Sequence, residues 1–205
     1  MSNIKFVDVD LGEAVALADL SGAATDLEDA QNLAEYLTDR FASGAVAHAI
    51  VDAFSTAILV KYARPFMTGV RGRLGPEILA GLTPHQIQLH ENFLAWRSKH
   101  IAHSVNPFEE NQVVAYYDEN TVAETGIQNI AVQQYHVVGL SPQDLVDIQT
   151  LADAILALVQ TRIDAEAARV LQIVRGRPVE AVLAVGTKPR SSAGMESVSR
   201  ARKRD

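Results

Sequence analysis

The stretch WRSKHIAHSVNPFEEN, residues 96–111, combines side chains that can hold a phosphate with side chains that can move a proton. Arg97, Lys99, His100 and His103 lie close together in it, although the chain has only six histidines. A histidine with a pKa near neutrality can remove a proton and return it. A guanidinium can hold a phosphate through two hydrogen bonds and stabilise the charge that grows on it. These residue types suit metal-independent cleavage of RNA at the 2′-hydroxyl.

The spacing of these residues predicts one ridge on a helix. Residues three apart are neighbours on an α-helical surface, so Arg97, His100 and His103 would follow one another over a rise of about 9 Å. Leu89 and Phe93, with Trp96, would give this ridge an apolar footing. A second proton-transfer group is missing, and a symmetry-related chain could supply it. The alternative interpretation is structural, because cations near a helix C-terminus complement its dipole.

The segment FLAWRSKHIAH resembles the Arg-x(4–6)-His motif of the HEPN superfamily. Upstream, AIVDAFSTAILVKYARPF is similar to a segment of the abortive-infection AbiU-like branch, and the likeness covers roughly residues 45–118. The resemblance implies a mainly all-α, HEPN-like bundle that dimerises across the motif. It also implies a metal-independent endoribonuclease of toxin or phage-defence type, without a cofactor, in which Arg97 and His103 form the catalytic pair. RNA, a second copy of the chain and an antitoxin or regulatory protein are the implied partners.

Two positions depart from the family pattern. The residue after the motif arginine is often Asn, Asp or His in active members, whereas here it is Ser98. Members with a nucleotidyltransferase antitoxin often carry Tyr two places after the histidine, where this chain has Val105. Ser98 favours an alternative function, a catalytically silent HEPN-like module that binds RNA, a nucleotide or a protein.

Residues near the motif pair are candidates for supporting roles. His100, Ser98 and Lys99 lie between Arg97 and His103 in the sequence. Glu109 and Glu110 could orient an imidazole, or they could form a solvated acidic turn.

Other histidines and charged residues give weaker signals. His48 lies in an apolar helical stretch and is expected to be a hydrogen-bonded core residue. His85 and His90 are five apart and do not share a helical face, which argues against a zinc site. Asp52 and Arg64 could form an internal polar network or support the motif arginine. The stretch GVRGRLG could help to hold a phosphate, but it lacks the Gly-Lys-Ser/Thr ending of a P-loop.

Composition and charge narrow the class of protein. The 205 residues are 48% hydrophobic and include no cysteine, which is compatible with a reducing cytoplasm. Residues 1–174 hold 10 Lys and Arg against 22 Asp and Glu, whereas residues 175–205 hold 8 against 3. An acidic body argues against a broad nucleic-acid-binding face, but it allows a local phosphate site. The most apolar run contains a histidine and an aspartate and is too short to span a membrane.

Hydrophobic periodicity predicts four long helices with a small β-hairpin insertion. Residues 1–24 are expected to be a loose lead-in with a short helix near 12–20. The bundle would cover 25–176, with a capping box at Thr25 opening its first helix and Gly44 ending it. The second helix would end before Pro65, because proline steers the preceding residue away from helical angles. A third would start at Thr83-Pro84 and continue to residue 106. Val, Ile and Tyr residues with turn residues between them predict a hairpin within about 112–138. Ser141-Pro142 with Asp144 would open the longest helix, over 142–174, whose leucines and isoleucines line one face. Residues 177–205 would form a basic, disordered tail.

Overall fold

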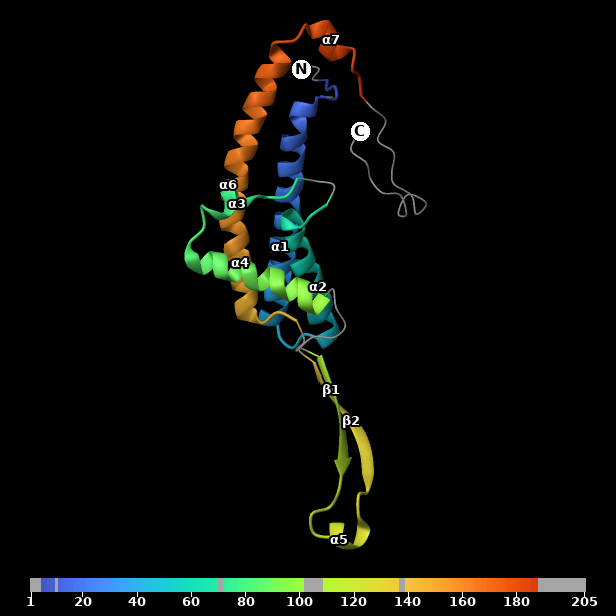
Figure 1. The fold of residues 1–205 in the computed structure, drawn as a ribbon. Helices are drawn as coiled ribbons and strands as arrows, with labels where there is room; N and C mark the ends of the chain where they lie inside the picture. Colours follow the sequence, from blue (N-terminus) through green and yellow to red (C-terminus); the bar gives the residue numbers. More distant parts are fainter. Residues whose placement is uncertain (1–4, 10, 70–71, 102–108, 137–138, 188–205) are drawn as a thin grey trace.

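The computed structural model describes residues 5–9, 11–69, 72–101, 109–136 and 139–187. These residues form a mainly helical fold with one two-stranded antiparallel sheet, as the sequence predicts (Figure 1). The elements of the first half are η1 (Gly12–Ala14), α1 (Val15–Ala42), α2 (His48–Ala63), η2 (Arg64–Phe66), α3 (Pro76–Leu79) and α4 (Pro84–Trp96). Those of the second half are η3 (Arg97–Ile101), β1 (Glu109–Tyr116), α5 (Val122–Thr125), β2 (Asn129–His136), α6 (Pro142–Arg175) and α7 (Val179–Leu183).

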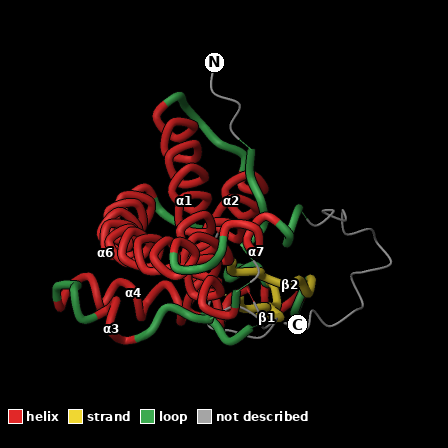
Figure 2. The backbone as a smooth tube through the Cα atoms, turned by 90° about the horizontal axis from the view of Figure 1, so that it is seen from above, coloured by secondary structure: helices red, strands yellow, loops and turns green. Residues whose placement is uncertain are grey.

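The longest helices, α1 and α6, lie side by side and run in opposite directions (Figure 1). Near one end of the pair the Arg169 guanidinium donates to the carbonyl oxygen of Glu13, at 2.6 Å. Towards the other end the Gln149 side-chain amide donates to the Thr38 hydroxyl, at 3.2 Å. Helix α2 packs antiparallel against α1, and α4 lies across one side of the long pair when the molecule is seen from above (Figure 2).

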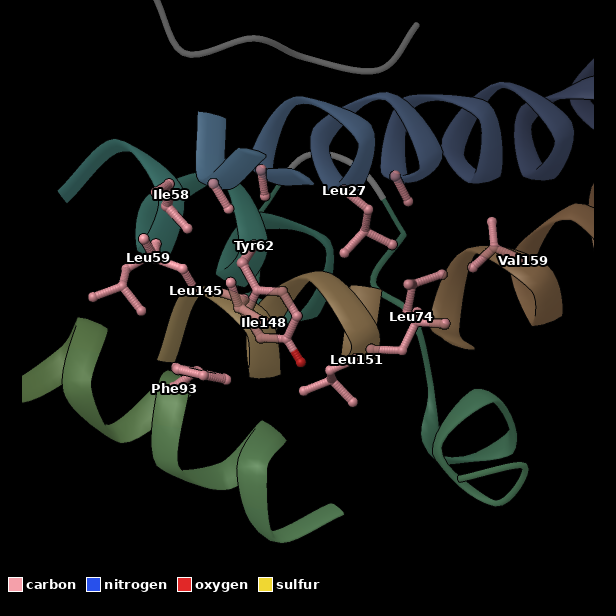
Figure 3. Packing of buried hydrophobic residues seen from close by; sticks show 14 of the residues in the cluster. Leu27, Ile58, Leu59, Tyr62, Leu74, Phe93, Leu145, Ile148, Leu151 and Val159 are labelled. Carbon is pink, nitrogen blue, oxygen red and sulfur yellow. The ribbon is translucent and has the colours of Figure 1, made fainter. Parts of the chain in front are cut away.

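One hydrophobic core lies between α1, α2, α4 and α6. Tyr62 of α2 and Phe93 of α4 face the long helices there, with Ile148 and Leu151 of α6 around the tyrosine ring (Figure 3). The predicted apolar face of α6 is confirmed, since its core residues recur at helical spacing. The α6 residues with at most 1% exposure are Leu145, Ile148, Leu151, Ala152, Ile155 and Val159.

Local capping signals set the starts of α4 and α6 as predicted. Thr83 and Gln86 form a reciprocal capping box, with Pro84 at the first helical position. Ser141 and Asp144 do the same for α6, at 2.8 Å from the Ser141 N–H to the Asp144 carboxylate. Each box satisfies backbone donors that the first helical turn leaves free.

The predicted start of the first helix is wrong. Thr25 lies inside α1, which begins at Val15, and its hydroxyl donates to the carbonyl oxygen of Ser21 instead of capping an end. The short helix expected near 12–20 is therefore present, but residues 15–24 are the first part of α1 and not a separate lead-in. The reason is packing, because Leu20 and Ala23 are buried. The predicted end is confirmed, since α1 ends at Ala42 and the chain turns at Gly44, whose φ is 134°.

The predicted end of the second helix before Pro65 is confirmed, since α2 ends at Ala63, but the reason given for it is wrong. Arg64 keeps helical angles, φ −52° and ψ −42°, although a proline follows it. Pro65 is buried and lies in the short 3₁₀ turn η2, and the chain leaves the helical region only at Met67. Tertiary burial of the proline outweighs its local effect on the residue before it.

The hairpin is present where β-branched residues were concentrated. Strands β1 and β2 pair in antiparallel register from Glu109 opposite His136 to Tyr116 opposite Asn129. The hairpin extends away from the helices, with α5 at its tip (Figure 1). Part of the predicted tail is ordered, because α7 follows α6 and the Asp8 N–H donates to the Gly186 carbonyl oxygen at 2.9 Å. Residues 188–205 lie outside the described residues.

Candidate functional site

The motif arginine lies where α4 changes into a π-helix. Helix α4 ends at Trp96, and Arg97 begins η3, a π-helical segment that runs to Ile101. The side chains of Arg97 and Ser98 are half-buried, and that of Lys99 is exposed. A half-buried guanidinium next to an exposed lysine is suited to meeting an anionic group that arrives from solvent.

The π-helical segment changes the predicted ridge. In a π-helix each N–H bonds five residues back, so neighbours three apart no longer align as they do on an α-helix. The predicted ridge assumed α-helical geometry at Arg97 and His100, whereas the backbone there is π-helical. The structure describes the backbone of His100 and Glu109 but not their side chains, and His103 and the predicted helix end at residue 106 lie outside the described residues.

The predicted apolar footing beneath the motif is confirmed. Phe93 is 2% exposed and meets the Tyr62 ring edge-on, with centroids 5.9 Å apart and planes at 70°. Leu89 and Trp96 pack against the same core, and η3 also contacts α2. The segment that carries Arg97 is thus fixed by the core on the side away from solvent.

A buried tyrosine–histidine pair lies about two helical turns before Arg97, because His90 precedes it by seven residues. The Tyr62 hydroxyl and the His90 Nδ1 atom are 2.8 Å apart, and both residues are buried. Burial raises the pKa of the Tyr62 hydroxyl and lowers the pKa of His90, with a smaller opposite effect of Glu91 on the histidine. The tyrosine therefore stays protonated and donates to a neutral imidazole, which places the ring proton on Nε2.

We expect this pair to make the fold sensitive to acid. The unfolded chain binds a proton at His90 below its ordinary pKa near 6.5, while the folded chain does not until its lower pKa is reached. The unfolded state binds more protons in that window, so the free energy of unfolding falls as pH falls through it. In urea titrations at pH 7.5 and 5.5, His90→Gln should lose less stability between the two values than the wild type. His85→Gln, an exposed position on the same helix, should behave like the wild type.

The burial of two histidines, His48 and His90, differs from what the sequence suggests. His48 was expected in the core, but it begins α2 and is exposed. His90, which sequence reasoning considered only as a zinc ligand, is 4% exposed. The signal that could have identified it is its position three residues before Phe93, on the face of α4 that meets the core.

A polar network joins α1 to the end of α2. The carboxylate of Asp26 is buried and lies 3.1 Å from the Arg64 guanidinium and 3.5 Å from the Lys61 ammonium. Lys61 also pairs with Asp29 at 2.6 Å. Arg64 therefore takes part in an internal network as predicted, but its partner is Asp26. The expected partner Asp52 is exposed, so that pairing was wrong.

An open hollow lies between α1 and α2, next to this network. Its volume is about 480 Å³, and the lining residues are Asp29, Asn32, Leu33, Tyr36, Phe54 and Lys61. The rings of Tyr36 and Phe54 are stacked, with centroids 5.0 Å apart. The described residues that line it include no histidine.

The described residues include neither a group of metal-ligating side chains nor a helix able to cross a membrane. In the ranges that the structure covers, no three His, Asp or Glu side chains are grouped to hold a metal ion. No helix there combines the length and hydropathy that a bilayer crossing requires.

The Gly-rich stretch that could help to hold a phosphate is described in part. Arg71 lies outside the described residues, and Arg73 is exposed. The Gly72 N–H donates to the Asp19 carboxylate at 2.8 Å.

Comparison of the chain with protein-family models gave no match, and comparisons with curated proteins and with solved structures gave none either.

Proposed function

We propose that this chain is a metal-independent endoribonuclease of the HEPN toxin or abortive-infection type, acting through Arg97 and His103. The observation that carries the proposal is the place of Arg97, half-buried at the first residue of a π-helical turn fixed against α2. Such turns are rare inside helices and frequently lie at functional sites. The four longer helices α1, α2, α4 and α6 support the HEPN-like part of the proposal.

In the proposed reaction His103 removes the proton of a ribose 2′-hydroxyl. The 2′-oxygen forms a bond to the adjacent phosphorus while the bond from phosphorus to the 5′-oxygen breaks. The products are a 2′,3′-cyclic phosphate and a 5′-hydroxyl, whose proton comes from a second acid. The Arg97 guanidinium stabilises the charge on the five-coordinate phosphorus through two parallel hydrogen bonds. A second chain across a two-fold axis would supply that acid.

A catalytically silent HEPN-like module is the second candidate, and Ser98 favours it. Ser98 is half-buried beside Arg97 and is neutral, so it offers the guanidinium no charge partner where many active members have an acidic or ring side chain. Such a module would bind RNA, a nucleotide or a partner protein. For either candidate an antitoxin or regulatory protein in the cytoplasm is a proposed partner.

Incubation of the full chain with single-stranded RNA in EDTA separates the two candidates. The enzyme should cut RNA under these conditions, because neither Arg97 nor His103 needs a metal to act. DNA of the same sequence should remain intact, because it lacks the 2′-hydroxyl. RNA that is bound and stays uncut, with or without divalent metal, would support the silent module.

The need for two chains gives a further prediction. The full chain should sediment as a homodimer at micromolar concentration. If each site needs the His103 of both chains, wild type mixed equally with His103→Ala and allowed to exchange should keep about one quarter of the activity at the same total protein concentration. Independent sites would keep one half. A monomer with full activity would contradict the shared site.

A further inference from the structure

The β1–β2 hairpin exposes an apolar face that the helices do not cover. Val113 of β1 is 69% exposed, and on β2 Ile130 and Val132 are 66% and 57% exposed. Val113 pairs with Val132 and Ala115 with Ile130, so all four lie on one face of the ribbon. The hairpin extends away from the helices (Figure 1). Clustered apolar side chains of this kind mark a surface that meets another protein.

The outer edge of β1 is open for a further strand. Within the part of the chain that the structure describes, the sheet has two strands, so each strand is paired there on one side only. Isolated two-stranded ribbons are marginally stable in water, and a third strand stabilises them. Exposed edges are usually protected by charged residues, yet residues 111–117 of β1 and the following turn, NQVVAYY, carry no charge. The edge therefore lacks the features that prevent strand addition.

Charge indicates which partner fits this edge. The hairpin, residues 109–136, contains five acidic residues and no lysine or arginine. The neutral stretch of β1 has Glu109 and Glu110 before it and Asp118 and Glu119 after it. This arrangement repels a nucleic-acid backbone. It also disfavours a second copy, because the like charges of two hairpins would meet.

We propose that the β1–β2 hairpin is a docking arm for a partner protein that adds a β-strand along β1. The partner strand has an apolar centre and basic residues at both ends. The neutral stretch of seven residues spans about 24 Å, which sets the length of that centre. Backbone hydrogen bonds provide the affinity, and the two acidic ends select the partner. The proposal is independent of any RNA cleavage by the chain.

The experiment uses a fluorescent peptide with a seven-residue centre, Lys-Lys-Thr-Val-Thr-Val-Thr-Val-Thr-Lys-Lys, titrated with the full-length protein. We expect saturable binding that weakens as salt is raised. A peptide with Glu in place of each Lys should not bind. A peptide with Pro in place of the central Val should not bind either, because it cannot form the strand. Equal binding of the proline peptide would show simple charge attraction and would overturn the proposal, as would no binding of the first peptide at low salt.

Protein variants locate the contact. Val113→Thr should weaken binding about fourfold, the effect of one buried methyl group, while Gln112→Thr on the opposite face should not. Asp118→Asn with Glu119→Gln should weaken binding and reduce its salt dependence. Asp52→Asn with Glu35→Gln, an equal charge change on the helices, should do neither. Equal affinity of the Val113 and Gln112 variants would place the peptide elsewhere and overturn the proposal. A lower sedimentation coefficient of Val113→Thr without peptide would assign the face to a second copy and also overturn it.

Discussion

Replacing His103 with alanine should lower the rate of RNA cleavage about 100-fold or more, because the proton of the 2′-hydroxyl loses its acceptor. Arg97→Lys should also be strongly impaired, since an ammonium is a point charge and cannot reproduce the planar fork of a guanidinium. His100→Ala should cost less, because His100 is outside the motif pair. Single-turnover cleavage of a labelled RNA at saturating protein measures the chemical step directly.

The control for these variants is His85→Ala. His85 is exposed near the start of α4, and its removal should leave both cleavage and melting temperature unchanged. The assignment of His103 would be wrong if its alanine variant cut RNA at the wild-type rate while remaining folded.

Gly139→Ala should cause a large loss of stability. Gly139 has a φ of 70°, which costs other residues about 1–2 kcal/mol. A Cβ there would also collide with the Ser55 hydroxyl and come within 3.0 Å of a Val51 methyl group. Overpacking adds about 1–3 kcal/mol, so the free energy of unfolding should fall by about 2–5 kcal/mol. Urea titration and thermal melting measure this, with a melting temperature roughly 4–20 °C lower.

Two further variants separate strain from collision at Gly139. Gly186→Ala has a similar φ of 66° but open space around it, so it should cost clearly less. Ser55→Ala removes the hydroxyl that accepts from the Leu140 N–H at 2.8 Å in a buried place, at a cost of about 1–3 kcal/mol. In the Gly139→Ala background, Ser55→Ala should add little to the loss of stability. The Ser55 hydroxyl oxygen both accepts the hydrogen bond and collides with the new Cβ, so one atom is the source of both costs. Fully additive costs would contradict this account of the turn into α6.

Elements with strong local signals could be predicted from the sequence. Helices α4 and α6 begin at the predicted capping residues, Thr83 and Ser141, because each cap forms within a few residues of chain. The hairpin was predicted from β-branched residues and turn signals alone. It has few partners outside itself that could change its structure.

Predictions failed where distant packing decides the outcome. Thr25 has the sequence of a helix cap, but burial of Leu20 and Ala23 continues α1 through it. Arg64 stays helical before a proline because η2 packs Pro65 into the core. The hydrogen bond between His90 and Tyr62 joins residues 28 apart in the sequence, so no local pattern could show that partner, although the position of His90 three residues before Phe93 indicated the buried face.

The candidate site could be predicted in part. The sequence identified the segment around Arg97 and its apolar footing, which Phe93 provides. It could not show the π-helical turn, because α and π turns differ by one residue in hydrogen bonding and share the same residue preferences here. The hollow beside Tyr36 combines residues of α1 and α2 and has no signature in either helix alone.

The proposed activity is tested most directly by the chemical ends of the RNA products. Mass spectrometry of an oligoribonucleotide of known sequence, treated with the purified full-length protein in EDTA, should find 2′,3′-cyclic phosphate on one fragment and 5′-hydroxyl on the other. Replacing the ribose at the cleaved position by 2′-deoxyribose should prevent that cut. Fragments with 3′-hydroxyl and 5′-phosphate ends would contradict attack by the 2′-hydroxyl, and RNA that is bound but intact would contradict the enzyme.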